Sequence, residues 1–178
     1  MSGKHSDSAE DDKANGRPPV IESPSKADGA AVWRIARGSH KLDLNSSYAY
    51  LLWCHDFADT SVVARVDDRT VGFVIGYRKP TAQDIAVVWQ VAVDDSQRGR
   101  GLAGRLLDDL FRRLTASGVR HLETTITPDN EASIRLFSSF AKRWNASLES
   151  TELFAAADFP DEHEPEYLYR IGPLVGVG

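Results

Sequence analysis

Hydrophobic and polar residues alternate along the chain with two different spacings, and these predict the order of strands and helices. The short apolar run at residues 32–36 (VWRIA) is typical of a strand. Residues 42–57 begin as a polar turn and become mostly apolar, which predicts a helix capped by Asn45, Ser46 or Ser47. The first predicted elements are therefore a strand and a helix.

The next segment is rich in β-branched residues. Residues 61–66 and 70–77 form two such runs, and the three residues 67–69 that join them favour an antiparallel hairpin. Residues 85–93 (IAVVWQVAV) are the most apolar run of the chain. A strand that is apolar throughout is covered on both faces, so we expect this strand at the centre of the sheet.

Helices and strands alternate in the second half of the chain. Apolar residues recur at helical spacing over residues 102–114, and Gly118 is expected to end that helix. Residues 121–127 predict a strand, and Asp129 is expected to cap a helix whose apolar side runs to Trp144.

Two further strands are predicted at residues 147–154 and 166–171, with a long acidic loop between them. The complete order is strand, helix, hairpin, central strand, helix, strand, helix, strand, strand. That order predicts one α/β domain with a mixed sheet.

Residues 1–30 differ in composition from the rest of the chain. They are rich in Ser, Asp, Lys, Gly and Pro, and their few apolar residues show no period. Such a segment buries too little apolar surface to offset the entropy lost on ordering. We therefore expect a disordered tail at 1–30 and a folded domain at 31–178.

The composition narrows the class of protein. With 42% hydrophobic and 26% charged residues, the chain is expected to be a soluble globular protein. Its net charge of −5 and lack of a basic stripe argue against nucleic-acid binding. The single cysteine, Cys54, excludes an internal disulfide and a cysteine-rich metal site. One cysteine suits a reducing compartment, and no membrane-spanning run or signal peptide is visible, so we expect a cytoplasmic protein. We expect no metal cofactor.

A glycine-rich loop joins the predicted central strand to the next helix. Residues 97–103 (QRGRGLA) place Gly99 and Gly101 where the first amides of that helix are free, and Arg98 and Arg100 add positive charge. Glycines allow a backbone to approach an anion closely, and a helix N-terminus favours a phosphate. The loop is thus predicted to bind a pyrophosphate; the alternative is a tight turn with solvated arginines. No GxxxxGK[ST] motif of a nucleotide triphosphate loop is present.

The strand end at residues 90–93 followed by Arg98-x-x-Gly101-x-Ala103 resembles the acetyl-CoA motif of the GNAT superfamily of N-acetyltransferases. The segment at residues 130–137 (NEASIRLF) resembles the second half of the same site. The resemblance implies a GNAT-like α/β fold, a mixed, mostly antiparallel twisted sheet flanked by helices, with acetyl-CoA as co-substrate. The implied cofactor-binding residues are Val91, Ala92, Val93, Arg98, Gly99, Arg100, Gly101, Leu102, Ala103, Asn130 and Phe137.

One position departs from the superfamily pattern. Phe137 stands where a tyrosine usually protonates the departing thiolate, so the usual general acid is missing. The resemblance further implies that a neutral substrate amine attacks the thioester, whose carbonyl is polarised by a backbone amide near Val91 or Ala92. A carboxylate or a water relay must first take a proton from the ammonium group. Asp43, Glu123 and Glu166 are the candidates, and for each the alternative is a solvated surface charge.

Three stretches resemble a narrower family, the L-2,4-diaminobutyrate acetyltransferases of ectoine biosynthesis. They are residues 42–52 (LDLNSSYAYLL), 88–93 (VWQVAV) with the following 97–103 (QRGRGLA), and 123–137. This resemblance implies acetyl transfer to the side-chain (γ) amine of diaminobutyrate. It makes Asp43, Trp89 and Glu166 the candidate catalytic residues. The implied substrate-binding residues are Asp43, Asn45, Tyr48, Trp89, His163 and Glu166.

These side chains suit a diamino acid, which offers two cationic groups and a carboxylate. Asp43 and Glu166 can hold ammonium groups, and Trp89 can wall the aliphatic chain and attract a cation. By strict alternation, Trp89 shares one strand face with Val91 and Val93; the alternative is a core tryptophan. For His163 the alternative is an ordinary surface histidine, and Thr125 is interpreted as an ordinary strand residue.

Two other functions stay open at this point. One is an acetyltransferase acting on a polyamine, an aminoglycoside or a protein N-terminus. The other is a non-catalytic CoA sensor, for which the missing tyrosine would mark lost activity. The expected partners are a small diamino acid and CoA, with neither nucleic acid nor membrane. The family resemblance implies a homodimer, and two-fold assemblies are common.

Overall fold

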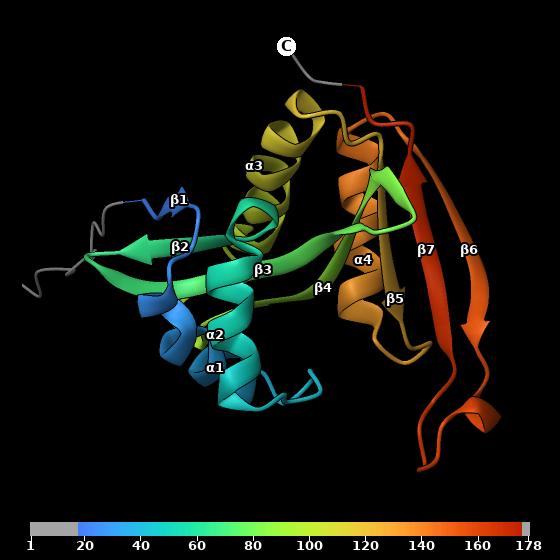
Figure 1. Ribbon diagram of the computed structural model, residues 1–178, viewed down its shortest axis with the longest axis horizontal. Coiled ribbons are helices and arrows are strands. Elements are labelled where there is room, and N and C mark those ends of the chain that lie inside the picture. The colour runs from blue at the N-terminus through green and yellow to red at the C-terminus, as the bar shows by residue number, and fades with distance from the viewer. Residues whose placement is uncertain (1–17, 176–178) are drawn as a thin grey trace, which may run out of the picture.

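The computed structural model describes residues 18–175, and residues 1–17 and 176–178 lie outside this range. Its seven strands form one sheet in the order β1-β2-β3-β4-β5-β7-β6 (Figure 1). The strands are β1 (Val20–Glu22), β2 (Val62–Val66), β3 (Arg69–Lys79), β4 (Ala82–Val93), β5 (His121–Ile126), β6 (Ser147–Phe154) and β7 (Glu166–Gly172). The helices are α1 (Gly29–Gly38), α2 (Ser47–Asp56), α3 (Leu102–Ala116) and α4 (Glu131–Arg143). Among the described residues, every strand pair is antiparallel except β4 with β5.

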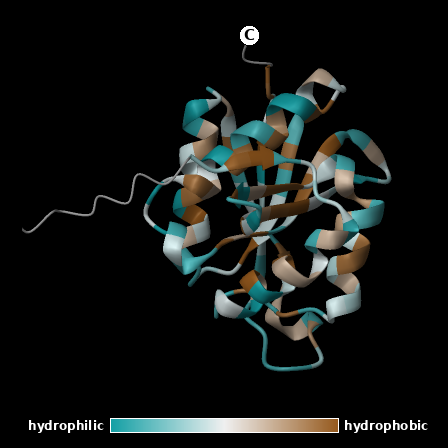
Figure 2. Ribbon diagram, turned by 90° about the vertical axis from the view of Figure 1, so that its left-hand side faces the viewer, coloured by the Kyte–Doolittle hydropathy of each residue, from teal (hydrophilic) through white to brown (hydrophobic). Residues whose placement is uncertain are grey.

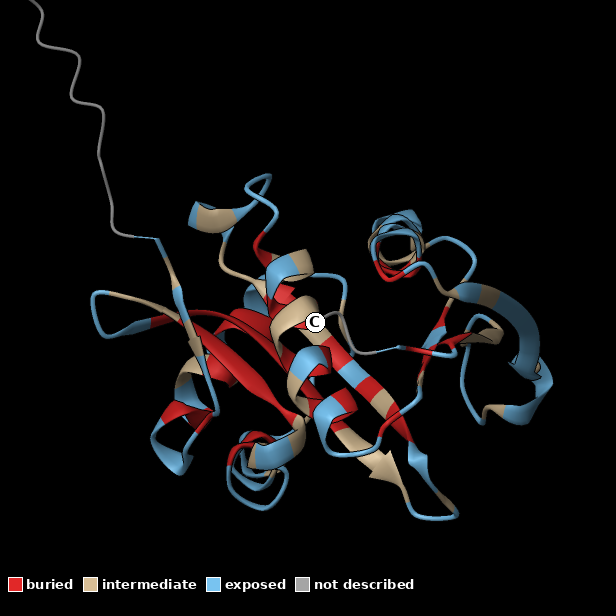
Figure 3. Cartoon of the chain, turned by 90° about the horizontal axis from the view of Figure 1, so that it is seen from above, coloured by how far each residue is buried: buried red, intermediate tan, exposed pale blue. Residues whose placement is uncertain are grey.

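The helices cover the sheet on both faces and divide the core in two. On one face, α1 and α2 bury a cluster that includes Val32, Tyr50 and Phe73. On the other face, α3 and α4 bury a larger cluster that includes Phe111 and Phe140. Figure 2 shows the hydrophobic residues gathered in the central strands, and Figure 3 shows the buried residues along them. The predicted α/β fold with a mixed, mostly antiparallel sheet is confirmed.

Most of the predicted elements are confirmed, with small shifts at their ends. The hairpin β2–β3 turns at Asp67 and Asp68, whose positive φ angles of 46° and 64° suit a two-residue turn. Ser46 caps α2 by accepting a hydrogen bond from the amide of Ala49. Gly118, with φ of 100°, follows α3 in the left-handed region that ends many helices.

The predicted strand at residues 32–36 is wrong, because these residues lie inside α1. Five residues are too few to reveal a helical period. Over the whole of α1, Val32, Ile35 and Ala36 recur at the i, i+3, i+4 spacing of one helix face, and all three are buried. The apolar run is therefore the buried side of a helix.

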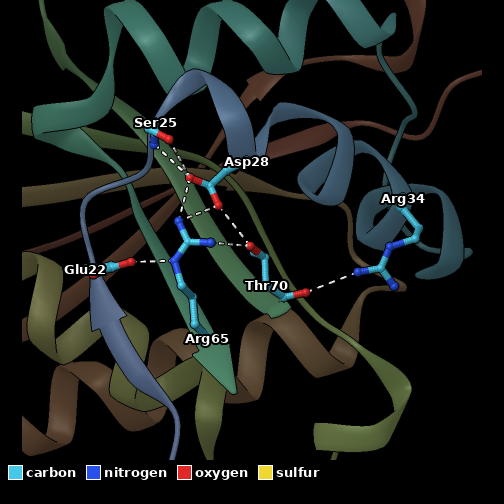
Figure 4. A network of polar contacts seen from close by, with 6 residues as sticks. All are labelled: Glu22, Ser25, Asp28, Arg34, Arg65 and Thr70. Carbon is cyan, nitrogen blue, oxygen red and sulfur yellow. Dashed lines mark hydrogen bonds and ion pairs between the residues drawn. The ribbon is translucent and has the colours of Figure 1, made fainter. Parts of the chain in front are cut away.

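The predicted tail at residues 1–30 is wrong for its last part. Val20–Glu22 forms β1, which pairs with β2, and Asp28 is only 1% exposed. The cause is a long-range polar network (Figure 4). The Asp28 carboxylate accepts hydrogen bonds from the Ser25 amide at 2.8 Å and the Thr70 hydroxyl at 2.9 Å, and it pairs with Arg65 at 2.7 Å. The part of the prediction that covers residues 1–17 lies outside the described residues.

The predicted cap of α4 is also wrong by one residue. Asn130, not Asp129, accepts a hydrogen bond from the Ser133 amide at 3.1 Å. Asp129 instead accepts a hydrogen bond from the Thr127 hydroxyl at 2.7 Å, in the turn before the helix.

A β-bulge in β4 changes which residues share a face. Ile75 pairs with Gln90 and Gly76 pairs with Val88, so Trp89 is the extra residue of the bulge. Gly76 is required opposite the bulge, because a Cβ there would collide with the Val87 carbonyl. The predicted alternation is therefore wrong.

The two sides of the bulge lie in different environments. Val91 and Val93 pack against the α3/α4 core. Trp89 instead stacks on Trp53 of α2, with ring centroids 6.0 Å apart.

Candidate active site

The two parallel strands at the centre of the sheet separate partway along their length. β4 and β5 pair only from Ile85 to Val87 with His121 to Glu123, and the Thr124 hydroxyl then donates to the Val88 carbonyl at 3.1 Å. Beyond this point the two strands are not paired with each other in the described chain. Backbone groups of β4 after Val88 are thus free on the side toward β5, where an extended ligand can pair with them.

The glycine-rich loop lies directly beyond β4. Gly99 and Gly101 both have φ of 71°, and Gly101 is the N-cap of α3 with no side chain to occupy the first helical amides. The loop therefore leaves these amides to a ligand, as an anion requires. Arg98 is exposed and pairs with Asp95 at 2.9 Å, and Arg100 is also exposed.

The spacing Gly99-x-Gly101-x-x-Gly104 also matches the GxGxxG motif of dinucleotide-binding loops. That motif belongs to a doubly wound parallel sheet with helices between parallel strands. Here β4 has an antiparallel neighbour on one side and a short parallel pairing on the other. The sheet therefore excludes the dinucleotide fold.

A groove of about 740 Å³ runs from this loop between α3 and α4. Gly99 and Gly101, both predicted to bind the cofactor, line it. Sequence reasoning missed its other lining residues, which include Gly104, Arg105, Ala132, Arg135, Leu136, Ser139 and Arg143. Those on α4 recur every three or four residues on one helix face, and this spacing was the available signal. The arginines make the groove suitable for a phosphorylated ligand.

The second half of the predicted cofactor motif lies at the start of α4. The Asn130 side chain caps the helix through Ser133, so its carbonyl oxygen is already used. Phe137 is 2% exposed and belongs to the α3/α4 core. No hydroxyl is present at this position, as the sequence implies.

On the opposite face of the sheet, three predicted residues from separate segments come together. His163 Nε2 lies 3.7 Å from a carboxylate oxygen of Asp43 and 3.8 Å from one of Glu166. Asp43 comes from the connection between α1 and α2, His163 from the connection between β6 and β7, and Glu166 from the start of β7. Phe159 stacks on the His163 ring with centroids 4.0 Å apart, which fixes the ring in the cluster.

The ionisation of this cluster is shifted by its surroundings. Burial raises the pKa of the Glu166 carboxyl above its usual value, and the Asp43 charge adds to the rise, while Thr125 and His163 oppose it. A hydrogen bond from His163 Nδ1 to the Glu164 carbonyl raises the pKa of His163, and the charges of Glu166 and Asp43 raise it further. A carboxylate with a raised pKa is a better proton acceptor, which is the property that a general base needs.

Two buried residues that the sequence reasoning missed hold Asp43 in place. The side-chain amide of Gln90 donates to the backbone carbonyl of Asp43 at 2.8 Å. The Tyr50 hydroxyl donates to the side-chain oxygen of Gln90 at 3.0 Å. Gln90 is 6% exposed on the central strand, and a buried polar residue in an apolar strand was the signal for it. The loop that carries Asp43 is thereby fixed to β4.

The remaining predicted acceptor residues differ in their placement. Trp89 is 51% exposed and lies on the α1/α2 face. Tyr48 is exposed on α2, and the Asn45 amide donates to the Tyr50 hydroxyl at 3.4 Å. Thr125, interpreted from the sequence as an ordinary strand residue, lies beside Glu166 and lowers the pKa of that carboxyl.

Glu123, for which a solvated surface charge was the alternative interpretation, is buried. It is 2% exposed on β5 and pairs with Lys79 of β3 at 2.6 Å and with Arg170 of β7 at 3.2 Å. Among residues 18–175, no group of three or more His, Cys, Asp or Glu side chains is placed to hold a metal ion. Burial raises the pKa of the Cys54 thiol to about 12, which makes it a packing residue and a poor nucleophile.

None of the helices in residues 18–175 is long and apolar enough to cross a membrane.

The chain resembles known proteins over most of its length. Residues 30–141 match the acetyltransferase (GNAT) family. An L-2,4-diaminobutyric acid acetyltransferase of Streptomyces coelicolor is 59% identical over 161 residues, which are 89% of this chain and 95% of that protein. One of Nocardia farcinica is 54% identical over 155 residues, covering 87% and 80% of the two chains.

A solved structure matches as well. It is the diaminobutyrate acetyltransferase EctA from Paenibacillus lautus in complex with its substrate L-2,4-diaminobutyric acid and coenzyme A, with a TM-score of 0.85 and 38% identity. The match covers 92% of this chain and all of that one.

Proposed function

The chain belongs to the acetyltransferase (GNAT) family and, within it, to the L-2,4-diaminobutyric acid acetyltransferases, and we propose that it acetylates the γ-amine of L-2,4-diaminobutyrate. Acetyl-CoA is the donor, and the product is N-γ-acetyl-diaminobutyrate for ectoine biosynthesis. The observation that carries the proposal is the cluster of Asp43, His163 and Glu166 on one face of the sheet, opposite the groove between α3 and α4. Among the described residues, β4 and β5 are not paired beyond Val87 and Glu123, and we expect the thioester to reach the acceptor there.

The donor fits the groove because each part of CoA meets matching groups. The pyrophosphate lies on the free amides at Gly99–Ala103, where the start of α3 is positive. The pantetheine arm then pairs with the backbone of Val91 and Val93, as an added strand would. The thioester reaches the opening beside Trp89, where a β4 amide near Val91 or Ala92 polarises its carbonyl.

The acceptor reaction needs a neutral amine. The substrate ammonium binds between Asp43 and Glu166, and Glu166 takes its proton. The amine nitrogen then attacks the thioester carbonyl carbon, and a tetrahedral intermediate forms. This intermediate gives a second proton to water and collapses, breaking the C–S bond and releasing the amide and the CoA thiolate.

The thiolate leaves without a protein hydroxyl at position 137. A thiol pKa of about 8.5 makes the thiolate a good leaving group, so protonation by water is sufficient. We also propose a cytoplasmic homodimer that binds neither nucleic acid nor membrane. Light scattering that gives twice the mass of one chain would support the dimer.

The test of this function is the release of CoA thiol with a set of amines. L-2,4-diaminobutyrate is expected to give the highest kcat/KM, well above putrescine, spermidine, an aminoglycoside and a peptide with a free N-terminus. Thiol release with a polyamine but not with diaminobutyrate would contradict the acceptor. Binding of CoA without release with any of these amines would instead indicate a sensor.

Replacing Trp89 with alanine is expected to weaken the use of the acceptor, diaminobutyrate, more than the binding of CoA. The half-exposed indole walls the acceptor and stacks on Trp53, and its loss removes apolar contact and cation–π attraction of about 1–2 kcal/mol. We expect kcat/KM for diaminobutyrate to fall about 10-fold, and the Kd for CoA measured by calorimetry to stay within about 2-fold. Equal losses for both ligands would contradict this placement.

Replacing His163 with glutamine is expected to shift the pH profile. Glu166 must be ionised to take a proton, so activity is lost as the pH falls through the pKa of its carboxyl. The positive charge of His163 lowers that pKa, which burial holds above its usual value. Removing this charge raises the pKa further, so the acidic limb of kcat/KM against pH should move to higher pH. An acidic limb at the wild-type position or lower would show that His163 does not act on the base.

A further inference from the structure

A buried carboxylate on the acceptor face is held by two cations. Glu123 lies on β5 with its side chain 2% exposed. Its two oxygens face Lys79 Nζ at 2.6 Å and Arg170 Nη1 at 3.2 Å, so each oxygen has its own partner. The three residues come from β5, β3 and β7, and no step of the proposed reaction uses them.

The charges of this cluster do not cancel. One carboxylate faces two cations, which leaves one positive charge in excess in a chain whose net charge is −5. Both cations are partly exposed, with side-chain exposures of 38% for Lys79 and 42% for Arg170. Glu149 lies opposite Arg170 in the β6–β7 register, but no ion pair joins them in the described residues. The excess charge is therefore open to an anionic ligand.

The cluster lies on the same face of the sheet as the acceptor residues. Glu123 is two residues from Thr125 on β5, and side chains two residues apart in a strand share a face. Thr125 lies beside Glu166, and Arg170 pairs directly across from Glu123. The cation pair and the candidate base are thus two ends of one surface.

The separation of these two ends matches the length of the substrate. Arg170 lies four positions after Glu166 along β7, which at about 3.3 Å per position places their Cα atoms about 13 Å apart. In an extended diaminobutyrate the γ-nitrogen and the carboxylate carbon are about 5 Å apart. A hydrogen bond of about 2.9 Å at each end extends this to about 11 Å. Long side chains that lean along the strand take up the difference.

We propose that Arg170 and Lys79, oriented by Glu123, bind the carboxylate of the amino-acid acceptor. This inference rests on the proposed function. With its carboxylate held there, the substrate passes along Trp89, and its γ-amine lies at Glu166 beside the opening between β4 and β5. The site thus selects an amino acid over a simple diamine, and it presents the γ-amine to the thioester.

The test compares two acceptors that differ only in the carboxylate, L-2,4-diaminobutyrate and 1,3-diaminopropane. For the wild type we expect kcat/KM to be at least about 30-fold higher with diaminobutyrate, because the charge-assisted hydrogen bonds to the carboxylate are lost with the diamine. For Arg170→Gln we expect kcat/KM with diaminobutyrate to fall about 30-fold, mostly through KM. With diaminopropane the change should stay within about 3-fold, and Arg170→Lys should recover part of the preference.

The control is Arg112→Gln, which removes the same charge from an exposed position on α3 and should leave both values unchanged. Should Arg170→Gln fail to fold because Glu123 loses a partner, Glu123→Gln with Arg170→Gln removes both charges of this ion pair. It is compared with Glu123→Gln alone, for the same two acceptors.

Different results contradict the proposed function and the carboxylate site. A wild-type protein that transfers no acetyl group to diaminobutyrate contradicts the proposed function itself. The carboxylate site alone is contradicted if the wild type acetylates diaminobutyrate but the variants lower kcat/KM for both acceptors in parallel, or leave the ratio of the two values unchanged. A parallel loss would show that the three residues only brace the strands.

Discussion

Replacing Glu166 with glutamine is expected to lower kcat for diaminobutyrate by about 10³-fold, within the range that general bases contribute. Glutamine keeps the shape of the side chain but cannot take the proton of the substrate ammonium. Burial and the Asp43 charge raise the pKa of the Glu166 carboxyl, so the variant removes a group suited to proton transfer. The rate of thiol release at saturating acetyl-CoA measures the effect.

The matched control is Glu162→Gln, an exposed carboxylate in the same connection between β6 and β7. It should retain wild-type kcat. Raising the pH supplies more neutral amine without the base, so the Glu166→Gln variant should recover activity steadily toward alkaline pH. A variant with wild-type kcat at neutral pH would show that another group, or water, takes the proton.

The second large effect is expected on stability, from Asp28→Asn. Asp28 joins η1 (Lys26–Asp28) to β2 and β3 through Ser25, Arg65 and Thr70, as Figure 4 shows. The substitution leaves the half-buried Arg65 without its buried carboxylate partner. We expect the free energy of unfolding to fall by about 3 kcal/mol, the usual cost of breaking a buried ion pair. Urea unfolding at neutral pH measures it, with the exposed Asp59→Asn as control.

The same contacts predict how this effect depends on pH. Burial opposes ionisation of Asp28, but the bonds from Ser25, Thr70 and Arg65 outweigh it and lower the pKa of the carboxyl below its usual 3.8. A lowered pKa in the folded state gives stability that is present above the unfolded pKa and is lost as the pH falls through the folded one. The difference between wild type and variant should therefore be full at neutral pH and shrink only under strongly acidic conditions. A difference that is constant down to the acid range would contradict the ion pair as its cause.

The central part of the fold could be predicted because its signals are local. Residues 85–93 are apolar enough to indicate the central strand, and the helical spacing of residues 102–114 indicates α3. β1 and the true nature of residues 32–36 could not be predicted in the same way. A three-residue strand exists only because β2 and the Asp28 network hold it, and these contacts join residues about forty positions apart.

In the site, too, the features that depend on consecutive residues could be predicted, and those that depend on strand pairing could not. The glycine loop carries its chemistry in consecutive residues, so the sequence alone indicated an anion. The face on which Trp89 lies depends on the bulge, which Gly76 on the neighbouring strand allows. Likewise, the ion pairs of Glu123 with Lys79 and Arg170 depend on strand order, which no spacing along the chain reveals.

Acetylation of the γ-amine is tested most directly by the position of the acetyl group in the product. The enzyme is given acetyl-CoA labelled with ¹³C at the carbonyl and unlabelled L-2,4-diaminobutyrate, and the product is examined by proton–carbon correlation NMR. We expect a correlation from the labelled carbonyl to the γ-methylene protons. A correlation to the α-proton, or no acetylated diaminobutyrate at all, would contradict acetylation of the γ-amine.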